Sequence, residues 1–500
     1  MSDDAPFSSL FDRSLLWLGA AVPLLVLASG KGTIPVAAWL APIVLLRFVR
    51  EQPVVRGSLL AATVLAAVYC VMWRGMMPFS GLLFYATSIG LGLVAVLPYV
   101  IDRVLAPRLS LSVATFVFPT AVVAIEYVSS FGPFGTWGSA AYTQQSLALL
   151  QLTSVTGIWG ITFLIHWTAS VVNAAWEEGL AGSGIRRVGG LWAGVLVAVL
   201  LFGGARLAFT GSSDTVPVAT VTGNHTAPTF WAVRRRAPSR AAVRDSARAV
   251  QRDYLARARR AAQAGARLVS WPEAAVPVPI EDTTAFLDRA RAVATQEEVY
   301  LVVAVNVFPR PDSEKRLQNT VIWMDPEGTV RTKARKTHLV PGEPGQPGTG
   351  QLPTIETPHG AWTSAVCYDM DFPSLIRQAG RQDVDLLVAP SNDWRAIGPQ
   401  HAHMARVRAI ENGTSLLRPT SNGHTFATDP LGRVRARMDH FTTDRRLQTA
   451  HLPTESVSTA YSVLGGVFAW GCLGGLLVLV GVGVWASPTR PSESIGSVSA

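Results

Sequence analysis

The feature that most constrains this chain is a series of long apolar runs that begins near its N-terminus. Residues 14–208 are dominated by Leu, Val, Ala, Gly and Trp with few charges, and residues 461–486 are apolar again. A helix that crosses a bilayer needs about 20 mostly apolar residues, with a range of about 17–25. The first block is too long for a signal peptide, so we predict a helical membrane bundle. The candidate spans are 14–30, 34–49, 57–73, 80–101, 111–130, 153–174 and 190–208, with 461–486 as the eighth.

The charges in the loops between these runs predict the orientation of the chain. Lys and Arg are retained on the cytoplasmic side of a membrane. Several Arg residues follow the second, fourth and sixth runs, whereas each alternate loop holds at most one basic residue. We therefore expect the N-terminus and the Arg-rich loops inside, and the polar block after the seventh run outside.

Composition divides the chain into four predicted parts. Residues 1–210 form a seven-helix transmembrane domain, and residues 211–455 carry most of the Arg, Asp and Glu. Residues 456–486 form one more transmembrane helix. The last part, residues 487–500, is rich in Ser and Pro and is expected to be a disordered cytoplasmic tail.

The polar block alternates strand-like and helix-like patterns, which is typical of a layered α/β fold. In such folds, the carboxyl ends of strands meet at one rim, where sites form. Glu273 ends the strand-like ARLVSWPE, and Cys367 ends the apolar part of WTSAVCYD. We therefore expect these two side chains to lie close together.

The net charge of +9 owes much to residues 234–260, where Arg recurs every four residues from Arg240 to Arg252 on a predicted helix. The simplest interpretation is a solvated helix face. The alternative is contact with anionic lipid headgroups. No nucleic-acid-binding motif is visible, so nucleic acid is not an expected partner. A single cysteine in the polar block excludes a disulfide framework there.

Three residue types at the predicted rim suit nucleophilic chemistry. A thiol such as Cys367 needs a base to become a thiolate, and Glu273 follows an apolar strand that would partly desolvate its carboxylate. Lys336, in ARKTHLVPGE, supplies a cation for the charge on an attacked carbonyl. Each residue also has an ordinary interpretation: a buried cysteine, a solvated strand-end acid, and a lysine in a basic turn.

The motifs WPE, K-x-H-L and CYD-x-x-FP, in this order, resemble the Glu-Lys-Cys triad of the nitrilase superfamily. The resemblance implies an external αββα sandwich in which Cys367 is the nucleophile, Glu273 the general base and Lys336 the oxyanion partner. It also implies supporting residues near the cysteine, which are Glu343 in VPGE, Tyr368 in CYD and Asn392 in SND.

One subgroup of this superfamily, apolipoprotein N-acyltransferase, is similar to the chain over nearly its whole length. The stretches EYVSSFGPFGTWGSAAYTQQ and TGIWGITFL resemble patterns of its membrane part. Glu126 in the first stretch is an acid within an apolar run, where acids are costly and often functional. The other interpretation is an acid that bonds a neighbouring helix.

The resemblance implies an acyltransferase of the bacterial inner membrane, with its catalytic domain on the periplasmic face. The donor would be a membrane phospholipid, and the acceptor the N-terminal amine of a diacylglyceryl-apolipoprotein. A monomer among membrane lipids is implied, without a cofactor. The alternative is a membrane-anchored amidase or nitrilase with the same triad, because the chain departs from the subgroup's patterns near Gly223, Gly342 and Trp394.

His401 and His403 raise the question of a metal. An i, i+2 pair points to different sides of a helix, and the sequence around it holds no set of carboxylates or cysteines at ligand spacing. We therefore expect no metal site.

Overall fold

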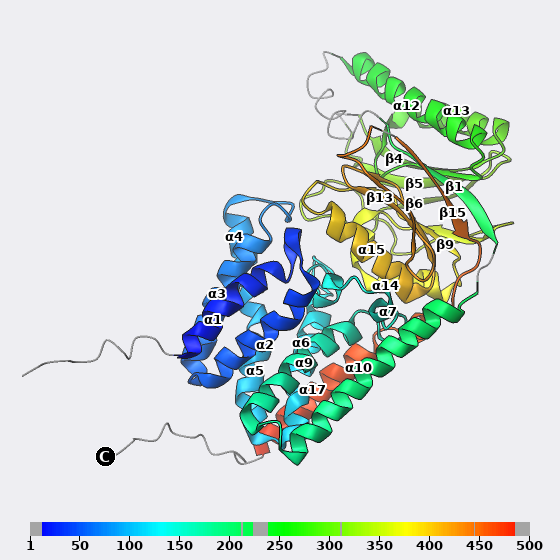
Figure 1. Ribbon diagram of the computed structural model, residues 1–500. Coiled ribbons are helices and arrows are strands. Elements are labelled where there is room, and N and C mark those ends of the chain that lie inside the picture. The colour runs from blue at the N-terminus through cyan, green and yellow to red at the C-terminus, as the bar shows by residue number, and fades with distance from the viewer. Residues whose placement is uncertain (1–12, 212–213, 224–238, 311–312, 445, 486–500) are drawn as a thin grey trace, which may run out of the picture.

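The computed structural model describes residues 13–211, 214–223, 239–310, 313–444 and 446–485 (Figure 1). The expected disordered tail, residues 487–500, lies outside the described residues, as does the stretch after Gly223 in which the chain departs from the subgroup pattern. An N-terminal helical region and the last helix form one body, and an α/β domain lies at one end of it. The predicted fold class is therefore confirmed.

Each apolar run contains a helix, because every backbone group in a bilayer must find a partner within its own segment. In the described part of the chain, five helices or helix pairs have the length and hydropathy of a span, and a sixth is possible if a pair bent by 114° counts as one. The first two helices are shorter, at 15 and 17 residues. The count of seven spans plus one stays a prediction. The helices are α1 Arg13–Leu27, α2 Pro35–Glu51, α3 Val54–Met72, α4 Gly81–Ala95, α5 Leu97–Leu105, α6 Leu111–Ser129, α7 Leu147–Leu150, α8 Thr153–Thr156, α9 Trp159–Glu178, α10 Ser183–Phe209 and α17 Val467–Trp485.

Two sheets stack face to face in the α/β domain. The first has the strand order β15-β1-β2-β4-β5-β6, with β3 beside β4, and the second has the order β14-β13-β11-β9-β8-β7. Apolar side chains from both, among them Trp323 and Trp362, fill the space between them. The first sheet contains β1 Thr215–Val221, β2 Leu268–Ser270, β3 Val276–Pro279, β4 Tyr300–Phe308, β5 Gln318–Met324, β6 Val330–Arg335 and β15 Leu447–Pro453. The second contains β7 Ile355–Thr357, β8 Gly360–Ser364, β9 Leu386–Val388, β11 Ser415–Arg418, β13 His424–Thr428 and β14 Val434–Asp439.

Helices cover both outer faces of the sandwich. α12 Arg240–Gln263 and α13 Thr283–Gln296 pack on the first sheet, and α14 Pro373–Arg381 and α15 Gly398–Asn412 cover the second (Figure 1). α15 is buried along nearly its whole length because it lies between its sheet and the membrane helices. It ends at Gly413, whose left-handed φ of 65° suits a residue without a Cβ.

The Arg-rich helix α12 lies at the end of the sandwich that is far from the apolar helices (Figure 1). Arg240 pairs with Glu281 at 2.9 Å, and Arg244 pairs with Asp282. These contacts hold the arginines on the domain's own surface. The structure therefore favours the solvated face and does not support contact with lipid headgroups.

The elements around the cysteine differ from their sequence patterns. The predicted strand through Cys367 ends at Ser364, and a 3-10 turn, η6 Cys367–Asp371, separates it from α14. The pattern VDLLVAPSND forms two short strands, β9 and β10 Ser391–Asn392, with β10 paired to β12 Thr420–Ser421. These breaks let backbone carbonyl groups turn toward the rim.

Candidate active site

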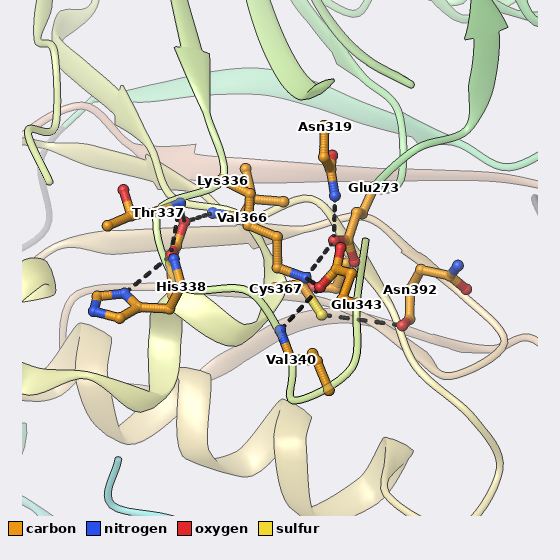
Figure 2. Close-up of polar contacts among 12 residues, drawn as sticks. Glu273, Asn319, Lys336, Thr337, His338, Val340, Glu343, Val366, Cys367 and Asn392 are labelled. Atoms are coloured by element: carbon orange, nitrogen blue, oxygen red, sulfur yellow. Dashed lines mark hydrogen bonds and ion pairs between the residues drawn. The ribbon is translucent and has the colours of Figure 1, made fainter. Parts of the chain in front are cut away.

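Lys336 lies at the centre of a buried ionic cluster at the rim of the two sheets (Figure 2). Its Nζ is 2.8 Å from Glu273 Oε1 and 2.7 Å from Glu343 Oε2. The side chains of Lys336 and Glu273 are 2% and 5% exposed. Asn319 donates from Nδ2 to the same Glu273 oxygen at 2.7 Å. The cluster therefore holds the Glu273 carboxylate in one orientation.

The ends of two strands and a turn position this cluster. Glu273 follows β2, and its N–H donates to the carbonyl oxygen of Ser391 in β10 at 3.3 Å, which ties the end of the first sheet to β10. Lys336 follows β6 and donates from its N–H to Asn319 O at 2.9 Å. Glu343 closes a turn by accepting the Val340 N–H at 3.0 Å. The rim expected from the sequence thus brings Glu273, Lys336 and Glu343 together.

Cys367 stands on a tight bend between β8 and α14. Its φ is 49°, which is uncommon for a residue with a Cβ and is often found at functional sites. The Cys367 N–H donates to Pro390 O at 2.9 Å, and the Sγ lies 4.0 Å from Asn392 O. The side chain is 5% exposed and lies beside Lys336 and Glu343 (Figure 2).

Burial determines the resting charges of the site. Burial, followed by the negative charge of Glu273, raises the pKa of the Cys367 thiol well above its ordinary value. Burial alone would lower the pKa of Lys336, but the charges of Glu273 and Glu343, together with that of Cys367 when it is ionised, raise it well above its ordinary value. The resting cysteine is therefore a thiol beside a lysine cation, and it needs a base at the moment of attack.

Asp369 is a functional candidate that our sequence reasoning missed. Its carboxylate accepts backbone N–H groups from Val366 at 3.0 Å, Thr337 at 3.1 Å and His338 at 2.7 Å. It therefore joins the bend of Cys367 to the segment that follows Lys336. The only indication in the sequence is its place two residues after the cysteine. That position does not show which N–H groups the carboxylate accepts.

The two other supporting residues lie on either side of the cysteine. Tyr368 donates from its hydroxyl to Pro133 O at 2.5 Å, and Pro133 belongs to the loop after α6. The Asn392 side chain accepts from Asn422 Nδ2 at 2.9 Å. Tyr368 thus connects the rim to the membrane helices, whereas Asn392 is held within the α/β domain.

A cavity of about 930 Å³ extends from the rim into the helical bundle. Its upper part is lined by Cys367 and its ionic neighbours, and its lower part by apolar and aromatic side chains of α2 to α6, such as Leu65 and Val122. This volume lies near the upper end of the range for small-molecule sites, about 300–1,000 Å³. The cavity therefore joins Cys367 to a largely apolar space within the bundle.

Glu126 lines the same cavity from α6. Its carboxylate accepts from Ser139 Oγ at 2.9 Å, Thr162 Oγ1 at 3.1 Å and the Ala140 N–H at 3.3 Å. These donors come from the loop after α6 and from α9. The acid therefore bonds neighbouring elements, and a direct role in chemistry stays a prediction.

His401 and His403 do not form a joint metal site. The sulfur of Cys367, a carboxylate oxygen of Asp393 and a ring nitrogen of His401 lie within 4.8 Å of one another. However, Arg418 Nη2 is 2.9 Å from Asp393 Oδ1 and 3.0 Å from His401 Nδ1. A permanent cation thus already balances this carboxylate, which argues against a metal ion there.

Known proteins match both parts of the chain. A family model described as Carbon-nitrogen hydrolase matches residues 218–461, and one described as Apolipoprotein N-acyltransferase N-terminal domain matches residues 18–171. The apolipoprotein N-acyltransferase of Geobacter metallireducens is 29% identical over 422 residues, which are 77% of this chain and 76% of that protein. That of Vibrio cholerae is 31% identical over 41% of this chain and 45% of its own. Among solved structures, an amidase from Nesterenkonia sp. is 19% identical over 50% of this chain and 94% of its own, with a TM-score of 0.38.

Proposed function

Because the chain belongs to the apolipoprotein N-acyltransferase family of the nitrilase superfamily, we propose that it moves an acyl chain from a phospholipid to a lipoprotein. The acceptor is the N-terminal amine of an S-diacylglyceryl cysteine. Cys367 carries the acyl chain between the two substrates as a thioester. The observation that supports this most is the cavity that joins the sulfur to the apolar interior of the bundle.

The first half-reaction forms the thioester. Glu273 removes the proton of Cys367 as the sulfur attacks the ester carbonyl carbon of the donor. Lys336 stabilises the negative charge that develops on the carbonyl oxygen. The C–O bond then breaks, and the leaving alkoxide takes the proton from Glu273 and departs as a lysophospholipid.

The second half-reaction transfers the acyl chain to the amine. The neutral α-amine attacks the thioester carbonyl carbon and gives a proton to Glu273. The C–S bond breaks, the amide forms, and the sulfur of Cys367 recovers the proton. Lys336 again stabilises the oxyanion, so one set of groups serves both steps.

The location and assembly of the protein follow from the same proposal. Since the donor and the acceptor are lipids, the protein works in the membrane, and we place the α/β domain on the periplasmic face of the inner membrane. All the groups in the mechanism come from one chain, which supports a monomer. A membrane-impermeant thiol reagent should label Asp245→Cys in intact cells but label Arg108→Cys only after lysis. The reverse pattern would place the α/β domain in the cytoplasm.

A membrane-anchored amidase is the rival, since water could take the acyl group from the same thioester. The match of the membrane part to the acyltransferase family model does not favour it. The mass of the N-terminus of a model lipoprotein, incubated with phospholipid and this protein, tests the proposal. A gain of one acyl chain supports transfer, and an unchanged mass with release of free fatty acid contradicts it.

A further inference from the structure

We propose that His401 is a second cation beside the Cys367 sulfur, and that it stabilises the thiolate whenever the sulfur loses its proton or its acyl chain. The inference rests on the proposed function, because it concerns the same nucleophile. In the proposed role, His401 acts on the charge of the Cys367 sulfur and makes no bond to the substrate.

Geometry places the imidazole next to the sulfur. A ring nitrogen of His401 and the Sγ of Cys367 lie within 4.8 Å of one another. His401 comes from α15, and its side chain is 2% exposed and lines the same cavity. In this buried environment, charges interact more strongly than in water. A cation at this place therefore acts on the sulfur and offsets the negative charge of Asp393, which lies within the same 4.8 Å.

Two carboxylates hold the ring as an imidazolium. His401 Nδ1 is 2.7 Å from Asp393 Oδ1, and Nε2 is 3.3 Å from Asp371 Oδ1. Only the charged form of histidine carries a proton on both nitrogens. The Asp371 side chain is fully buried, and among the described residues neither its oxygens nor His401 Nε2 makes a hydrogen bond, so the two groups face each other as an ion pair. An uncharged ring would leave this buried carboxylate without a counter-ion.

The charged groups that face His401 come from several elements. Asp371 and Cys367 belong to η6, Asp393 follows β10, and Arg418 on β11 approaches Nδ1 at 3.0 Å. The membrane part contributes the uncharged Trp137 ring, 6.0 Å away. Burial and the Arg418 charge would lower the pKa of His401, but Asp371 and Asp393 outweigh them and raise it to about 9. The ring is therefore charged at neutral pH and loses its charge as the pH rises through about 9.

The charge of His401 can stabilise the thiolate of Cys367. Burial, Glu273 and Asp393 oppose the thiolate, whereas Lys336 and Arg418 favour it. Two carboxylates share the charge of Lys336 on the other side of the site. The thiolate forms when Cys367 attacks the donor and again when the amine displaces it. A cation from α15 lowers the energy of both states.

The same helix provides a matched control. His403 lies two residues from His401, and its side chain is also buried. Burial, with the nearby Arg406 charge, lowers the pKa of His403 to about 4, so the ring is neutral at pH 7. Replacement of His403 removes an imidazole of similar burial but no charge.

The test is the alkylation of Cys367 by iodoacetamide, measured by peptide mass between pH 6 and about 10, the range over which histidine and thiol groups titrate. The protein is the full chain in detergent, with Cys70→Ser and Cys472→Ser to remove the other thiols. At pH 7, His401→Gln should react at least roughly tenfold more slowly than the parent protein. The two rates should converge as the pH passes about 9. His403→Gln should match the parent protein at every pH.

A second variant, Asp371→Asn, tests the same charge independently, because its expected effect is a shift along the pH axis and not a loss of folded protein. Asp371→Asn removes one of the two carboxylates that hold the His401 charge. In this background, the pH at which the rates with and without His401→Gln converge should fall by roughly one unit or more. A rate ratio for His401→Gln that is constant with pH would mean a structural role and overturn the inference, as would an unmoved convergence point. Because alkylation needs no lipoprotein, a failure of acyl transfer with the expected alkylation profile would reject the proposed function alone.

Discussion

The hydroxyl of Tyr368 donates a hydrogen bond to the carbonyl oxygen of Pro133, with 2.5 Å between the two oxygens. Tyr368 directly follows the candidate nucleophile, and Pro133 belongs to the loop after a membrane helix. Close by, the Thr136 N–H donates to Asp371 O at 3.0 Å. These contacts fix the bend of Cys367 against the helical bundle, so that the sulfur and the apolar cavity keep one alignment.

Tyr368→Phe should weaken this alignment without removing any reacting group. The lost hydrogen bond is worth about 0.5–1.5 kcal/mol, so transfer should fall by roughly threefold to tenfold. The loss should appear in kcat/KM for long-chain phospholipid, because the cavity holds the chain. Alkylation of Cys367 should change little. Equal losses in both assays would mean that Tyr368 affects the sulfur and not the alignment.

Cys367→Ser should abolish acyl transfer and leave folding intact, because a hydroxyl is similar in size and far less acidic. Cys70→Ser and Cys472→Ser are the controls, since both lie on helices of the membrane part, away from the ionic cluster. They should keep most of the activity. Transfer by Cys367→Ser at near the parent rate would reject the thioester.

Asp369→Asn should loosen the joint between the cysteine bend and the segment after Lys336. Three backbone N–H groups share this carboxylate, and weakening a buried acceptor costs about 1–3 kcal/mol. We expect a lower midpoint of thermal unfolding and a slower formation of the acyl-enzyme. Asp288→Asn, at an exposed position of α13, should change neither. An Asp369→Asn protein that is as active as the parent would exclude this role.

Lys336→Met should destabilise the protein by about 3–5 kcal/mol, because it leaves buried carboxylates without their cation. The pKa of Lys336 is raised in the folded protein, so its stabilising effect is complete below the pKa of an unfolded lysine and is lost only as the pH rises through the folded value. The difference in unfolding free energy should therefore be constant from pH 7 to about 10. Lys333→Met, on the exposed side of β6, is the control. A difference that disappears between pH 7 and 9 would contradict the ionic cluster.

Sequence patterns predict the parts of this site that depend on neighbouring residues in the chain. A strand that ends in an acid and a strand that ends near a cysteine place Glu273 and Cys367 at one rim, and the structure brings them together. The α/β layers follow from the same alternation. An acid within an apolar run marks Glu126, but its hydrogen-bond donors come from other elements and have no local signature.

The remaining features depend on contacts between distant segments. The Asp369 carboxylate accepts the N–H groups of Thr337 and His338, which lie 32 and 31 residues away. No sequence pattern near Asp369 indicates these contacts. His401 is charged because Asp371 faces it from η6 and Asp393 faces it from the segment after β10. The sequence raised only the question of a metal pair there, and we expected none. Tertiary packing also explains why the strand before Cys367 ends early, since η6 turns to meet the membrane loop.

The fate of the thioester tests the central claim most directly. With phospholipid alone, the protein should accumulate an acyl group on Cys367, detectable by peptide mass, and a diacylglyceryl peptide with a free α-amine should clear it. The same peptide with a blocked amine should leave the adduct in place, and Glu273→Gln should slow its formation because the thiol loses its base. Steady release of free fatty acid without peptide, at the rate of the peptide reaction and with no adduct on Cys367, would contradict acyl transfer.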